Sequence, residues 1–172
     1  MTSESVALAR GVDEIIEIVP GRLFALGGVV EVHGDLSWAP ADLDGYQRIN
    51  CYLAVEGSVA TLVDTGVTAQ QEVVVAQLTE LLPRDAELAI FLTRSEYECV
   101  GGINAVTDTF PVTNIYTGGG LNPFDAFDVV TSLDRPRPGR VKVRRGDTTQ
   151  VGGRVSIISP LLRVLRTYWG FD

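Results

Sequence analysis

Apolar residues between positions 22 and 63 form runs that are typical of β-strands. The segments 22–30 (RLFALGGVV), 49–55 (INCYLAV) and 59–63 (VATLV) are rich in strand-forming residues. Gly57-Ser58, between the second and third runs, predicts a tight turn. The three segments therefore predict a β-meander.

A helical pattern follows the meander. Over residues 69–82, four apolar side chains fall on one helical face: Val74, Leu78, Leu81 and Leu82. Thr68 is placed to cap the start of this helix, and Pro83 follows its end. The pattern predicts one amphipathic helix packed against the meander.

The next run, 88–92 (LAIFL), is continuously apolar, as a strand buried on both faces should be. Because crossover connections in one sheet are right-handed, the helix places this run parallel to 59–63 in a βαβ unit. Residues 101–109 predict a short helix and 112–116 another strand. The glycines at 118–120 then end the pattern.

Beyond a proline-rich loop at 134–139, two further strands are predicted. Residues 140–144 and 154–158 lie on either side of Arg145-Gly146-Asp147, and we expect them to pair antiparallel in a second sheet or at an edge. The alternation of strands and helices along the chain predicts an α/β fold with mixed sheets.

Composition limits the partners of the chain. Its 14 Lys and Arg against 22 Asp and Glu give a formal net charge of −8, which disfavours nucleic acid and anionic lipid as partners. No apolar run approaches the ~20 residues of a membrane-spanning helix, and residues 1–10 do not resemble a secretory signal, so we expect a cytoplasmic protein. With 172 residues, we expect one domain over 21–172, preceded by a tail or first strand over 1–20.

Few residues in the chain are typical metal ligands. Cys51 and Cys99 are too few for a disulfide scaffold and lie in no CxxC motif, so we expect reduced thiols. His33 is the only histidine, and it is interpreted as a surface or hydrogen-bonding residue rather than a ligand. Zinc and non-haem iron sites normally use several imidazoles, which this chain lacks.

Two loops stand out as candidate sites. Asp64-Thr65-Gly66 follows the run 59–63, and residues 93–102 follow the run 88–92. Because the carboxyl ends of parallel strands meet at one edge of a sheet, we expect these loops to be neighbours.

An ordered series of short motifs resembles the metallo-β-lactamase fold. The series comprises residues 50–53 (NCYL), 62–66 (LVDTG), a helix, an apolar strand that leads into Thr93, and Gly101-Gly102. In that family the second loop reads T-H-x-H-x-D-H-x-G-G. The branch of flavodiiron and related oxygen-binding di-iron proteins has glutamate at the second histidine, where this chain has Glu96.

The C-terminal segment is similar to the same branch. Arg145-Gly146-Asp147, Gly152-Gly153, 159–163 (SPLLR) and 167–172 resemble its G-D…G-G…P-x-L-H…Y-D series. The resemblance covers 21–172 and implies an αββα sandwich, truncated after the first half to two-thirds. It also implies that the family's last two ligands would lie past the end of this sequence.

The resemblance implies a degenerate metal site. Its first histidine corresponds to Arg94, its aspartate to Glu98, its next histidine to Cys99 and its downstream histidine to Arg163, and only Glu96 is retained. Arginine stays protonated and cannot ligate a metal, but it can neutralise carboxylates. We therefore expect no cofactor, and an ionic cluster in place of two metals.

Four other residues of the two loops are assigned a structural role. They are Asp64, Gly66, Gly101 and Gly102, and the resemblance implies that Asp64 mainly braces the loop through backbone contacts. Cys99 is either an inert buried thiol or a thiolate activated by Arg94.

Two functions follow from these observations. The first is a pseudoenzyme, a binding protein or an assembly subunit that has lost its metal site and its enzyme activity. The alternative is an atypical hydrolase or oxidoreductase, with iron or zinc, that uses Glu96, Glu98 and Cys99. Aromatic residues near 168–171 suggest a homo-oligomer, or a protein partner that covers the C-terminal edge, with no role for nucleic acid or membrane.

Overall fold

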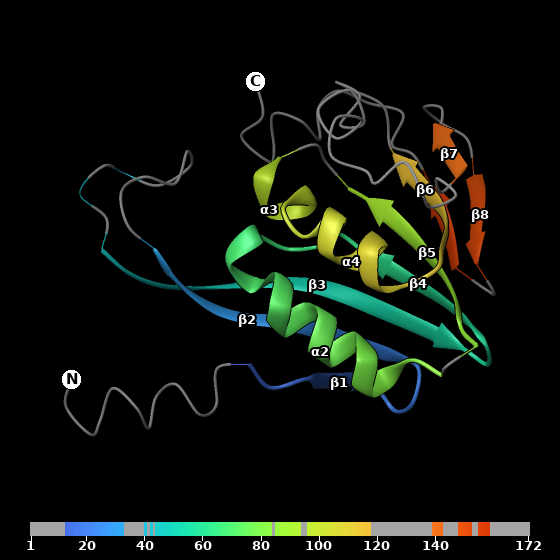
Figure 1. Cartoon of the computed structure of the whole chain (residues 1–172), viewed down its shortest axis with the longest axis horizontal. Helices are drawn as coiled ribbons and strands as arrows, with labels where there is room; N and C mark the ends of the chain where they lie inside the picture. Colours follow the sequence, from blue (N-terminus) through green and yellow to red (C-terminus); the bar gives the residue numbers. More distant parts are fainter. Residues whose placement is uncertain are drawn as a thin grey trace.

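A mixed β-sheet with helices on one face forms the body of the protein (Figure 1). The computed structural model describes residues 13–32, 40, 42, 44–83, 85–93, 96–117, 139–142, 148–152 and 155–158. Seven strands lie in the order β1-β2-β3-β4-β5-β6-β7, and two more, β8 and β9, pair with each other.

The first four strands form an antiparallel meander. They are β1 (Ile16–Val19), β2 (Leu23–Val32), β3 (Gly45–Glu56) and β4 (Val59–Val63). The turn between β3 and β4 contains Gly57 at φ +61°, in the left-handed region that favours glycine. The predicted meander is confirmed, and a strand forms within the segment 1–20.

The predicted βαβ unit is also confirmed. A short 3-10 turn, η1 (Thr68–Gln70), leads into α2 (Gln71–Leu81), and β5 (Glu87–Leu92) then pairs parallel with β4. Residue Leu82 is extended, as the residue before a proline tends to be, and this ends α2.

The predicted cap of this helix is wrong. Thr68 makes no capping hydrogen bond at either helix start, and its Oγ1 instead donates to the Gly101 carbonyl oxygen at 3.0 Å. The Thr68 hydroxyl therefore bonds to the loop after β5, a tertiary contact, and not to the helix start that the local pattern predicted.

Two short helices and a parallel strand continue the α/β alternation. They are α3 (Tyr97–Val100), α4 (Ile103–Thr109) and β6 (Val112–Thr117), and β6 pairs parallel with β5. The predicted helix at 101–109 and strand at 112–116 are confirmed to within a few residues.

The predicted pairing of the last strands is wrong. Strand β7 (Gly139–Lys142) does not pair with the 154–158 region but lies parallel to β6 as the seventh strand of the main sheet. Strand β9 (Val155–Ile158) pairs antiparallel with β8 (Thr148–Gly152). Only residues 153 and 154 separate β8 from β9, and such a short connection favours a local hairpin over a distant partner.

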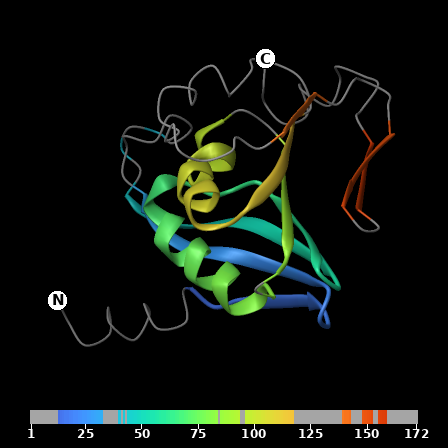
Figure 2. The same ribbon diagram turned by 45° about the vertical axis from the view of Figure 1, so that its right-hand side comes forward.

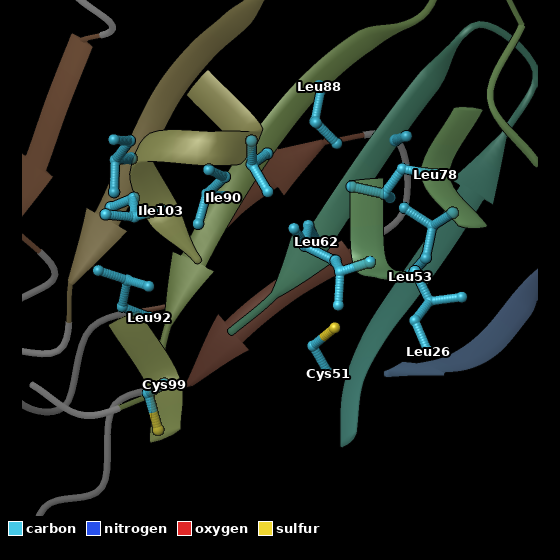
Figure 3. Close-up of a cluster of buried hydrophobic side chains, with 14 of the residues drawn as sticks. Leu26, Cys51, Leu53, Leu62, Leu78, Leu88, Ile90, Leu92, Cys99 and Ile103 are labelled. Atoms are coloured by element: carbon cyan, nitrogen blue, oxygen red, sulfur yellow. The ribbon is translucent and has the colours of Figure 1, made fainter. Parts of the chain in front are cut away.

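The core lies between the sheet and the helices (Figure 3). Alternate residues of the central strands point to this side. The largest fully buried side chains of these strands are Leu26, Leu53, Leu62, Leu88, Ile90 and Leu92. Val74 and Leu78 of α2 and Ile103 and Val106 of α4 close the core from the other side.

The opposite face of the sheet carries the hairpin of β8 and β9, which Figure 2 shows away from the helices. Strand β8 lies against β4 and β5. Thr61 of β4 and Ala89 of β5, which share that face, are buried. None of the helices in the described ranges is long and apolar enough to cross a membrane.

Candidate functional site

Strands β4 and β5 end side by side, and hydrogen bonds join the loops that follow them. The Asp64 carboxylate accepts from both the backbone N–H of Thr93 (2.8 Å) and the Thr93 hydroxyl (2.7 Å). The backbone N–H of Asp64 donates to the Phe91 carbonyl oxygen at 2.8 Å, and Asp64 itself has φ 59°. A non-glycine residue in this region is held by its surroundings, which here are the two bonds to Thr93.

The second connection joins Thr65 to α3. Both the N–H and the Oγ1 of Thr65 donate to the Cys99 carbonyl oxygen, at 2.8 and 2.9 Å. The N–H of Gly102 donates to the Gly66 carbonyl oxygen at 3.1 Å. Together with the bond from Thr68 to Gly101, these contacts hold the two loops as one unit.

The glycines of the loops are required by close backbone approach. A Cβ on Gly102 would lie 2.4 Å from the Thr65 carbonyl oxygen, and one on Gly101 would lie 2.6 Å from the Thr68 backbone nitrogen. Gly66 has φ +73°, a conformation that side chains disfavour. The two sequence motifs D-T-G and G-G therefore meet in space.

Three of the predicted metal positions, Glu96, Glu98 and Cys99, lie at the start of α3 or within it. Glu96 precedes this helix, and its carbonyl oxygen accepts from the N–H groups of Cys99 (2.9 Å) and Val100 (3.2 Å). Glu98 is half-buried in the first turn. The Cys99 side chain is buried, with its Sγ 3.6 Å from the Thr93 Oγ1.

These side chains do not form a ligand set. Within the described ranges, no three His, Cys, Asp or Glu side chains gather closely enough to hold a metal ion. Arg94, Arg163 and His33 lie outside the residues that the structure describes, as do residues 168–171. The structure brings six residues together at the carboxyl ends of β4 and β5: Asp64, Gly66, Glu96, Cys99, Gly101 and Gly102.

Cys51 lies in the core below this edge, among Leu53, Leu62 and other apolar side chains (Figure 3). Burial, and then the negative charge of Asp64, raise the pKa of the Cys51 thiol to about 12. Cys51 and Cys99 are both free thiols. The Cys51 thiol is therefore protonated at neutral pH and is a poor nucleophile.

Sequence reasoning missed two buried glutamines that attach η1 and α2 to strands β2 and β3. Gln77 accepts from the Gly27 N–H (2.7 Å) and donates to the Gly27 carbonyl oxygen (3.0 Å). Gln70 donates to the carbonyl oxygens of Gly28 (2.9 Å) and Ile49 (3.0 Å). The available signal was the pair Gly27-Gly28 inside a strand, together with polar residues seven apart in an amphipathic helix.

Thr93 was also missed as a site residue, although its contacts to Asp64 join the two loops. Its position directly after an apolar strand was the signal in the sequence. A threonine at a strand end offers both a backbone N–H and a hydroxyl to a neighbouring carboxylate.

Solved structures with a similar fold include an oxidoreductase and several metallo-β-lactamases. The rubredoxin oxygen:oxidoreductase of the anaerobe Desulfovibrio gigas matches with a TM-score of 0.60 and 14% identity, over 84% of this chain and 34% of that one. The subclass B3 enzyme MEM-A1 from a soil metagenome library matches with a TM-score of 0.55 and 12% identity, over 86% of this chain and 52% of that one. The metallo-β-lactamase of Hirschia baltica matches with a TM-score of 0.52 and 19% identity, over 80% of this chain and 56% of that one.

No protein-family model matches the sequence, and no curated protein matches it. The chain spans between about a third and just over half of the length of these three structures, 34% to 56%. The TM-scores of 0.52 to 0.60, over 80% to 86% of this chain, show the architecture that it shares with these structures. The chain has the metallo-β-lactamase fold.

Proposed function

We propose that this chain is a metal-free relative of the flavodiiron and oxygen-binding di-iron branch of metallo-β-lactamase-fold proteins, and that it acts by binding, as a pseudoenzyme or an assembly subunit. The observation that carries the proposal is the arrangement of donors after β5. Glu96, Glu98 and Cys99 belong to no group of three metal-binding side chains in the described part of the chain. They do not fit the metal centre that the fold family implies.

The sequence supports the same proposal. The whole chain has one histidine, and the resemblance places Arg94 and Arg163 where two ligand histidines stand in the family. A guanidinium has no lone pair to give to a metal, but it carries a permanent positive charge and five donors. In this proposal the two arginines supply the positive charge that Asp64, Glu96 and Glu98 need at the edge of the sheet.

The proposal also assigns the chain to a branch of the fold family, and it includes a partner and a cellular location. Glu96 at the position of the second histidine, and a structural neighbour that is a rubredoxin oxygen:oxidoreductase, support the flavodiiron branch. A second copy or another protein is the proposed partner, because the net charge of −8 disfavours nucleic acid and anionic membranes. Two free, buried thiols are compatible with a cytoplasmic location.

The metal-free claim is tested by thermal unfolding of the full chain with added Zn²⁺, Fe²⁺ or Mn²⁺, and with a chelator. A ligand that binds the native state raises its stability by mass action, so we expect the melting temperature to be the same in all conditions. A rise with one metal that disappears in the Glu96→Ala/Glu98→Ala variant would contradict the proposal. Glu72→Ala, on the exposed face of α2, is the matched control for loss of a carboxylate.

The charge-replacement claim is tested by a double-mutant cycle on Arg94 and Glu96. If the guanidinium balances the carboxylate, Arg94→Ala and Glu96→Gln each destabilise the fold, and the double variant loses less than the sum. We expect a coupling free energy of about 1 kcal/mol in urea unfolding. Additive effects would mean that the two side chains do not interact, and that the arginine does not replace a metal.

A further inference from the structure

We draw no further inference here: the strongest candidate, the exposed apolar edge of the main sheet at β1 with Ile16, Ile18 and Val19, carries none, because nothing in the described part of the chain shows what covers it.

Discussion

At the scale of single residues, the joined loops depend on glycines that leave room for a neighbouring backbone. Gly102 approaches Thr65 so closely that any side chain would push the carbonyl oxygen away. The same contact includes the hydrogen bond from the Gly102 N–H to the Gly66 carbonyl oxygen. The glycine motif therefore stabilises the loops whether or not they hold a metal.

Gly102→Ala should destabilise the protein by about 2 kcal/mol, because overpacking against backbone cannot be relieved by a rotamer change. Gly45→Ala is the matched control, since no atom lies within 4 Å of a Cβ at Gly45. Urea unfolding of the two variants measures the difference. Equal stabilities would show that the loops can separate at little cost.

Cys51 gives a pH dependence that belongs to one side chain. The pKa of its thiol rises from 9.0 to about 12 on folding, so the unfolded thiol ionises first as the pH increases. The stabilisation is fully present below pH 9 and is lost as the pH rises towards 12. We expect the free energy of unfolding to fall by up to about 1.4 kcal/mol per pH unit in that window.

The measurement is urea unfolding of the wild type and of Cys51→Ala at three pH values, about one pH unit below, at and about one unit above the pKa of 9.0 of the unfolded thiol. Cys51→Ala lowers stability at the lowest pH through the cavity it leaves, but it should show a smaller decline with pH than the wild type. Parallel declines in the two proteins would mean that another group titrates.

At the scale of elements, Gln77 attaches α2 to β2 through the backbone of Gly27. The positive φ of Gly27, +94°, turns its peptide groups towards the helix, where the glutamine amide both accepts and donates. A buried backbone group without a partner costs about 1–3 kcal/mol. Helix packing here therefore uses a polar clamp in addition to the apolar face of Val74 and Leu78.

Gln77→Leu should destabilise the fold by about 2–3 kcal/mol, because it removes the hydrogen bonds that the glutamine amide makes to the backbone of Gly27 and Asp13. Gln71→Leu, at the first position of the same helix, removes no hydrogen bond that the structure shows and should change stability by less than about 0.5 kcal/mol. Thermal unfolding of both variants compares the two effects. A loss of stability below about 0.5 kcal/mol in Gln77→Leu would show that the hydrogen bonds between Gln77 and Gly27 do not hold α2 to β2.

The elements also show where sequence reasoning succeeds. The runs that became β2, β4, α2 and β5 carry strong local patterns, and parallel pairing of β4 with β5 followed from the helix between them. The partner of β7 could not be predicted, because a four-residue strand carries no information about which strand lies beside it. For β9, the two-residue connection to β8 was the signal that was overlooked. Thr68 shows the same limit as β7, since its hydroxyl donates to the carbonyl oxygen of Gly101, which is distant in the sequence.

At the scale of the whole molecule, the fold class and the meeting of the two loops were predictable from the order of motifs. The hydrogen-bond partners of the residues in the two loops were not predictable. The sequence places Asp64 and Thr93 twenty-nine residues apart, and only the fold shows that both carboxylate oxygens are bonded to Thr93. The glutamines were missed for the same reason, because a polar residue on a buried helix face is explained only by the backbone opposite it.

The joined loops and the edge at β1 lie at different places in the main sheet. One end of the sheet carries β1, open and apolar, and the loops after β4 and β5 lie near its middle. Because the two regions are separate in the sheet, each can be altered by substitution without touching the other.

The most direct test of the central claim is the metal content per chain, measured by elemental mass spectrometry on full-length protein produced with iron, zinc and manganese and purified without chelator. We predict folded protein with far less than one metal ion per chain, unchanged in the Glu96→Ala/Glu98→Ala variant. Stoichiometric metal in the wild type that is lost in that variant would contradict the claim, and would establish a carboxylate-based metal centre in the loop after β5.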